Sequence, residues 1–190
     1  MHNYLFLPYH FVRMHDALRR WRGLFLFCLG LFAASLFVMQ WLEADFWSGD
    51  ERFSIVGLQL FYSKRDVLAV LTEMKQPTRI ALNYDLVVRF VFMTGFYPAI
   101  ACACMMTRET ARRTATKNIL FALAMLQPVA WVFDIAANFL VMGWIDKPEI
   151  GNEFRTCHNL VVVKWSIALA GIFVPLIAVF SRTGRRQHRA

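Results

Sequence analysis

The sequence predicts an all-α integral membrane protein in which four transmembrane helices form an antiparallel bundle. Hydrophobic residues make up 58% of the 190-residue chain and its mean hydropathy is +0.43, which is too apolar for a soluble domain of this size. Four segments also reach the roughly 20 apolar residues that are needed to cross a bilayer. We predict spans at residues 23–42, 86–106, 119–145 and 160–180, with an outer-surface helix in the loop at 43–83.

The distribution of Lys and Arg predicts the orientation. Twelve cations and two acids lie in the N-terminal tail, the second connection and the C-terminal tail, whereas seven cations and nine acids lie in the other two connections. The two sides therefore carry net charges of +10 and −2, and the positive-inside rule places both termini in the cytoplasm. We expect a multi-pass protein of the inner (plasma) membrane. Because the cations are split among three short pieces without a recognition motif, we expect no nucleic-acid partner.

The two ends of the chain are basic. Residues 1–22 alternate apolar and basic side chains, and Pro8 can open a helix there. We interpret this stretch as an amphipathic interfacial helix on the anionic inner leaflet, with docking to a partner protein as the alternative. Residues 181–190 form a basic cytoplasmic tail.

The loop at 43–83 contains one strong helix signal. Ser63 is followed three residues later by Asp66, a variant of the capping box, and apolar residues then recur at helical spacing from 64 to 75. We expect this helix to lie on the outer membrane surface and cap the bundle. The apolar stretch 53–62 before it fits a short strand or an interfacial patch.

The second span opens with a charged pair. Asp85 and Arg89 are four residues apart and can pair along the helix. Arg89 can extend outward to the interface or reach inward to Asp134, and the sequence leaves both open. The stretch from Gly95 to Pro98 suggests a bend in this helix.

The third span carries three polar residues on one face. Gln127, Asp134 and Asn138 are spaced so that the first and last each lie about 20° from Asp134 around the helix. A carboxylate near the middle of a bilayer costs roughly 2.5–3.5 kcal/mol. Asp134 is therefore either a structural buried acid that fixes helix register, or a ligand, ion or proton site.

The fourth span provides a candidate partner for this acid. Lys164 shares a face with the small or bent residues Ala168, Gly171 and Pro175, so it is expected to point into the bundle. We predict that Asp134 pairs across helices with Lys164 or Arg89. One acid between two bases leaves a net positive charge, which fits an anionic headgroup or carboxylate. The expected polar network contains Asp134, Asn138, Lys164, Arg89, Asp85 and Gln127.

Other chemistry is poorly supported by the sequence. Cys157 and His158 supply two ligands where a metal site needs three or four, so no metal and no cofactor are expected. Cys102 and Cys104 are two residues apart and point to different helix faces, which does not fit a disulfide-exchange enzyme. No complete catalytic motif is present, and we assign no catalytic residue.

From Tyr62 to Phe180 the chain resembles a family of small, uncharacterised bacterial four-span membrane proteins. The resemblance is carried by several motifs: Tyr62-Ser63, Arg79, Asp85, Tyr97-Pro98, Asp134 to Asn138, and Lys164-Trp165. The family pattern in the third span is Asp-x-x-Glu-Asn, and Ala137 stands here in place of its Glu. The resemblance implies a four-helix fold and supplies no activity.

Three functions remain open. The first is a non-catalytic membrane protein that binds a lipid, another small ligand or a membrane-protein partner through the outer-half polar network. The second is a small lipid-modifying membrane enzyme that uses Asp134 as acid or base. The third is a subunit of an oligomeric channel or transporter, because four helices hardly enclose a pore alone. A homo-oligomer is compatible with the first and required by the third.

Overall fold

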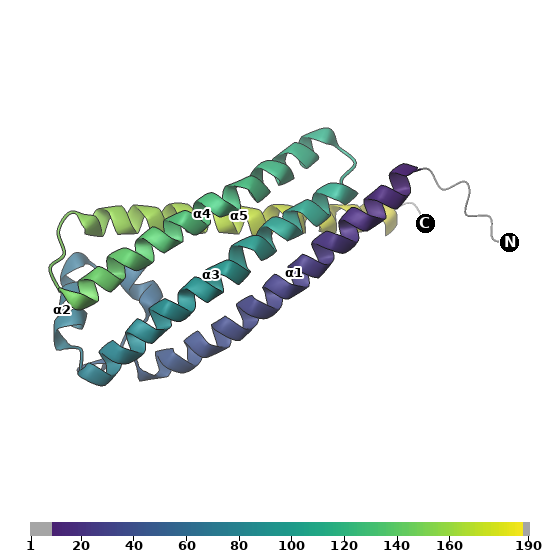
Figure 1. Cartoon of the computed structure of the whole chain (residues 1–190). Helices are drawn as coiled ribbons and strands as arrows, with labels where there is room; N and C mark the ends of the chain where they lie inside the picture. The colour runs from purple at the N-terminus through teal and green to yellow at the C-terminus, as the bar shows by residue number, and fades with distance from the viewer. Residues whose placement is uncertain (1–8, 188–190) are drawn as a thin grey trace.

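The chain folds into a bundle of long α-helices (Figure 1). The computed structural model describes the backbone of residues 9–187 and the side chains of residues 16–181. Its α-helices are α1 (Tyr9–Leu42), α2 (Lys64–Glu73), α3 (Gln76–Thr110), α4 (Thr114–Asp146) and α5 (Glu153–Gln187). All but α2 are long and apolar enough to cross a membrane, so the prediction of an all-α bundle with four candidate spans is confirmed.

The long helices run alternately up and down the bundle. α1 packs along α3, and α4 packs against both α3 and α5. The start of α1, the connection between α3 and α4, and the end of α5 lie at one end, which we call the tail end (Figure 1). Residues 43–75 lie at the opposite end, which we call the loop end.

Each predicted span lies inside a longer helix. α1 runs without interruption from Tyr9, because no proline or glycine pair breaks the helix between residues 9–22 and the predicted span. Pro8 and the rest of 1–8, and the side chains of 182–190, lie outside the described residues. α3 begins ten residues before the predicted span, since Pro77 occupies the first turn, where its missing N–H costs nothing.

The loop end contains short elements that bring the chain back over the bundle. A 3₁₀ turn, η1 (Glu43–Asp45), is followed by the hairpin strands β1 (Trp47–Ser48) and β2 (Glu51–Arg52), in which Trp47 pairs with Arg52. Gly49 takes the positive φ of 58° that this tight turn requires.

The stretch 53–62 corrects the sequence prediction. It contains a π-helical turn, η2 (Gly57–Phe61), instead of a strand. The alternative of an interfacial patch stays a prediction. Ile55, Leu58 and Gln59 are all buried, and the i, i+3, i+4 spacing of these residues is helical. The Ser54 hydroxyl accepts the Gly57 N–H at 3.0 Å, which stabilises the start of the turn.

The predicted capping box at the start of α2 is confirmed. The Ser63 hydroxyl accepts the Asp66 backbone N–H, and the Asp66 carboxylate accepts the Ser63 backbone N–H at 3.1 Å. α2 ends at Glu73, two residues before the predicted end, because α3 already starts at Gln76. Its buried face carries Val67 and Leu71.

The buried apolar residues form two clusters. The loop-end cluster joins the loop and α2 to the facing parts of α3, α4 and α5, through residues such as Phe46, Ile55, Leu86, Val141 and Val161. The tail-half cluster lies between α3, α4 and α5 and includes Met93, Tyr97, Leu120, Ala130 and Ala168. The polar network described below lies where these two clusters meet.

Gly95 sets the distance between α1 and α3. A Cβ atom at this position would lie 2.6 Å from the Phe32 backbone nitrogen and 2.8 Å from the Cys28 carbonyl oxygen. α3 continues through Gly95 and Pro98 as a single helix, and the bend that the sequence suggests near this glycine stays a prediction. Close helix approach is therefore what Gly95 provides.

Candidate functional site

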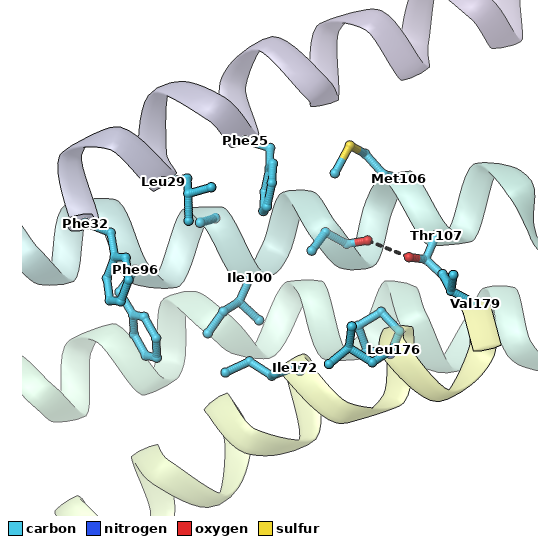
Figure 2. A pocket seen from close by; sticks show the side chains of 14 residues that line it. Phe25, Leu29, Phe32, Phe96, Ile100, Met106, Thr107, Ile172, Leu176 and Val179 are labelled. Atoms are coloured by element: carbon cyan, nitrogen blue, oxygen red, sulfur yellow. Dashed lines mark hydrogen bonds between the residues drawn. The ribbon is translucent and has the colours of Figure 1, made fainter.

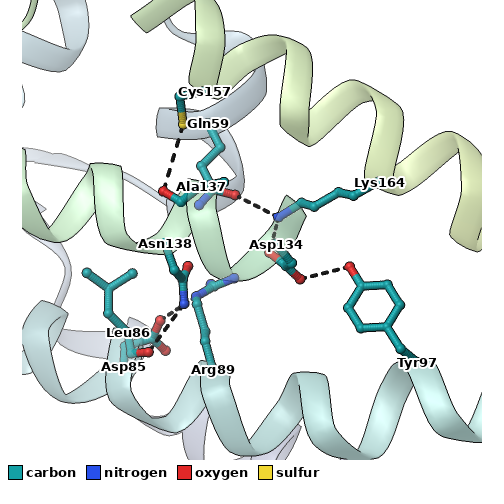
Figure 3. A network of polar contacts seen from close by, with 10 residues as sticks. All are labelled: Gln59, Asp85, Leu86, Arg89, Tyr97, Asp134, Ala137, Asn138, Cys157 and Lys164. Carbon is teal, nitrogen blue, oxygen red and sulfur yellow. Dashed lines mark hydrogen bonds and ion pairs between the residues drawn. The ribbon is translucent and has the colours of Figure 1, made fainter. Parts of the chain in front are cut away.

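Asp134 of α4 and Lys164 of α5 form a buried ion pair across the two helices (Figure 3). Only 7% of Asp134 and 3% of Lys164 is exposed. The sequence left open whether Lys164 or Arg89 pairs with Asp134, and the structure shows that Lys164 does. A buried carboxylate and ammonium compensate each other in this way only when the remaining oxygens and hydrogens also find partners.

Two further side chains provide such partners. The Tyr97 hydroxyl of α3 donates to Asp134 Oδ2 at 2.9 Å, and Gln59 Oε1 of η2 accepts from Lys164 Nζ at 3.5 Å (Figure 3). Sequence reasoning placed neither residue in the network. Tyr97 was noted only beside Pro98, and the helical spacing of Ile55, Leu58 and Gln59 is the signal that identifies Gln59.

A second charged group lies one turn closer to the loop end. Arg89 Nε donates to Asp85 Oδ2 at 2.8 Å, which confirms the pair predicted from their spacing. Arg89 also lies 3.6 Å from Glu43 Oε1 in η1. Its ion-pair partners among the described residues are these two acids, so the alternative in which Arg89 pairs with Asp134 is wrong. Glu43 was missed because its approach depends on how the chain turns after α1.

Asn138 connects the two groups. It follows Asp134 by one helical turn, and its Nδ2 donates to the Leu86 carbonyl oxygen at 3.4 Å, next to Asp85 (Figure 3). The side chain is fully buried. The polar network, as the structure has it, therefore consists of Asp134, Lys164, Tyr97, Gln59, Asn138, Asp85, Arg89 and Glu43.

Gln127 does not join this network. Its Nε2 donates to the carbonyl oxygens of Leu123 at 3.1 Å and Ile167 at 3.4 Å. A Cβ atom on Gly171 would lie 2.6 Å from the same nitrogen, so Gln127 occupies space that the glycine leaves open. The prediction that Gln127 shares a buried helix face with Asp134 holds. Its inclusion in the network was wrong, because two helical turns, about 10 Å, separate them.

The charge balance of the network differs from the sequence prediction. It contains two bases, Arg89 and Lys164, and three acids, Glu43, Asp85 and Asp134. With all five ionised, the formal charge is −1 instead of positive. The prediction of a free positive charge for an anionic headgroup is wrong, because Arg89 already contacts two carboxylates.

Three buried polar atoms of this network have no hydrogen-bond partner among the described residues. They are Gln59 Nε2, a donor, and Asp85 Oδ1 and Asn138 Oδ1, both acceptors. Each belongs to a residue that is at most 5% exposed. Buried polar atoms normally have a partner, and each exception needs an explanation such as water, an ion or a ligand.

Ala137 is the position at which the chain departs from the Asp-x-x-Glu-Asn pattern of the family that it resembles. Ala137 is fully buried, and its carbonyl oxygen lies 3.9 Å from the Cys157 sulfur.

The four cysteines of the chain are free and buried. Within the part of the chain that the structure describes, no three His, Cys, Asp or Glu side chains are grouped as metal ligands.

Comparison with known proteins adds no relative to this picture. No protein-family model, curated protein or solved structure matches the chain. The resemblance to a bacterial four-span family therefore stays a prediction that rests on the motifs in the sequence.

Proposed function

We propose that this chain is a non-catalytic, multi-pass inner-membrane protein that binds a small amphiphile through the outer-half polar network. The group that it recognises carries N–H or O–H donors, such as an amine or a hydroxyl. The observation that carries the proposal is the set of three buried polar atoms without a partner in one network.

The composition of these atoms supports a hydrogen-bond donor as the ligand group. Two of the three, Asp85 Oδ1 and Asn138 Oδ1, are acceptors and so require a donor from outside the network. The network also has one acid more than it has bases, which disfavours an anion and favours a neutral or cationic group. The single donor, Gln59 Nε2, requires an acceptor oxygen from outside the network.

The location follows from charge. In the proposed orientation, the basic tail end faces the cytoplasm and the loop end faces outward. Cysteines introduced as Glu73→Cys in α2 and Arg113→Cys between α3 and α4 are both at exposed positions. In intact cells, a membrane-impermeant maleimide is expected to label the first and not the second. Labelling of the second alone would reverse the orientation.

The ligand proposal is tested by native mass spectrometry of the full chain extracted in mild detergent. The wild type is expected to retain an amphiphile whose mass identifies its donor-bearing group. Asn138→Leu removes an unpartnered oxygen and keeps the Asp134–Lys164 pair, so it is expected to lose this adduct. The double variant Asp134→Leu/Lys164→Met removes both charges together and is expected to lose it as well.

Gln127→Leu is the matched control. Gln127 is a buried polar residue on the same face of α4, and its Oε1 also lacks a partner among the described residues, but it lies outside the network. The control variant is expected to retain the adduct. The proposal would be contradicted if no adduct of the wild type is lost from Asn138→Leu and kept by Gln127→Leu.

A further inference from the structure

An apolar groove lies in the tail half of the bundle, away from the polar network (Figure 2). α3 forms its floor, and α1 and α5 form its two sides. Its volume is about 380 Å³, which is within the range of roughly 300–1,000 Å³ that is typical of ligand pockets. The residues that define its length are Phe32 and Phe96 at one end and Thr107 and Val179 at the other.

The groove offers hydrocarbon contacts. Thr107 is the lining residue with a hydroxyl group, and it donates that hydroxyl to the Ala103 carbonyl oxygen at 2.9 Å (Figure 2). Toward the polar network the groove is closed by aromatic rings. Phe96 stacks on Phe32 at 5.5 Å between centroids and meets Trp165 edge-on at 6.2 Å. An occupant therefore enters from the tail end or from the side.

The size of the groove limits what fits in it. From Ala99 to Thr107 the floor is nine residues long, about 12 Å along the helix. The groove is open on one side, so a helix of about 10 Å diameter would lie across its opening instead of within it. A single flexible alkyl chain is narrow enough.

The tail end of the groove is basic. Arg22 of α1 is exposed and precedes Leu29, a lining residue, by seven positions, so the two lie about 20° apart around the helix. Arg22 is thus on the groove side of α1, one turn before Phe25. The N-terminal tail, the connection between α3 and α4 and the C-terminal tail together carry twelve cations and two acids in the sequence.

We infer that the groove holds one acyl chain of an anionic phospholipid, whose headgroup lies against Arg22. The lipid belongs to the leaflet at the tail end, which is the cytoplasmic leaflet in the proposed orientation. An apolar groove of this size selects an alkyl chain, and the adjacent cations select a negative headgroup over a zwitterionic one. The inference depends on the proposed orientation but not on ligand binding at the polar network.

The test uses delipidated full-length protein in mild detergent, titrated with phosphatidylglycerol or with phosphatidylcholine of the same acyl chains. Native mass spectrometry is expected to show one retained phosphatidylglycerol per chain and weaker retention of phosphatidylcholine. Arg22→Gln is expected to weaken phosphatidylglycerol binding about fivefold, the usual effect of one cation near an anionic lipid, and to leave phosphatidylcholine unchanged. Ala103→Trp fills the groove and is expected to abolish retention of both lipids.

Two controls match these variants. Arg20 is exposed and lies about 180° from Leu29 on α1, so Arg20→Gln is expected to have no effect on either lipid. Ile177→Trp adds the same bulk to α5 at a position that is 65% exposed and does not line the groove. It is expected to retain the lipid.

Three results would overturn the inference. One is equal weakening by Arg22→Gln and Arg20→Gln, which would indicate charge attraction without a site. Another is retention of phosphatidylglycerol by Ala103→Trp. The last is a lipid-free dimer that Ala103→Trp dissociates, which would make the groove a protein interface. No residue of the polar network lines this groove, so failure of the two proposals can be distinguished.

Discussion

The Tyr97 hydroxyl donates to Asp134 Oδ2 at 2.9 Å, while Lys164 pairs with the other oxygen of the same carboxylate. One acid on α4 thus connects α3 on one side and α5 on the other. Because both oxygens have partners, the free-energy penalty for burying this carboxylate is smaller than for an unpaired one. The first prediction concerns this hydrogen bond.

Tyr97→Phe removes the hydroxyl and keeps the ring. Hydrogen bonds to charged groups stabilise a protein by about 1.5–3 kcal/mol, so we expect the free energy of unfolding in detergent to fall by that amount. Tyr84→Phe removes an equivalent hydroxyl from a side chain that is 63% exposed and is expected to change the free energy little. Equal effects of the two variants would show that the Tyr97 contact contributes nothing.

The Asp134–Lys164 pair predicts a non-additive pattern. Asp134→Leu or Lys164→Met alone leaves one buried charge without its partner, and each is expected to cost about 3–5 kcal/mol. The double variant leaves no unpaired charge and is expected to cost less than either single one. A double-mutant cycle from unfolding curves measures this coupling, and additive losses would contradict the ion pair.

Gly95 predicts a steric effect at the contact of α1 with α3. Gly95→Ala places a Cβ atom 2.6 Å from the α1 backbone, so the two helices must separate and the melting temperature is expected to fall. Gly30→Ala is the control, because no atom lies within 4 Å of a Cβ there. It is expected to raise stability by up to about 1 kcal/mol through helix propensity. The prediction fails if Gly95→Ala is as stable as Gly30→Ala.

The capping box of α2 predicts a pH dependence. Hydrogen bonds from the Ser63 hydroxyl and backbone N–H lower the pKa of the Asp66 carboxyl below its ordinary value. A lowered pKa means that the ionised carboxylate favours the folded state. The resulting stability is present above the unfolded pKa of about 4 and is lost as the pH falls through the lower folded pKa.

Asp66→Asn is the variant that tests this dependence. The difference in unfolding free energy between wild type and Asp66→Asn is expected to be constant near neutral pH and to shrink below about pH 4. Hydrogen exchange of the α2 amides over the same pH range locates the effect in this helix. A difference that does not change with pH would contradict the role of the ionised Asp66.

Local spacing was sufficient to predict much of this molecule. The four long helices follow from the length of the apolar segments, and the Ser63–Asp66 cap from a separation of three residues. The Asp85–Arg89 pair follows from a separation of four, and the inward direction of Lys164 from its face of α5. Each depends on positions within a few turns of one helix, whose geometry is the same in every protein.

The membership of the polar network depended on the tertiary structure. Gln59 and Lys164 are 105 residues apart in the sequence, and Tyr97 and Asp134 are 37 apart. Lys164 pairs with Asp134, and Arg89 pairs with Glu43. This choice between the two bases follows from how α1, η1 and η2 pack on the bundle. Helix spacing gives the direction of a side chain around its own axis and leaves open which neighbour stands opposite, because that is decided by packing over the whole chain.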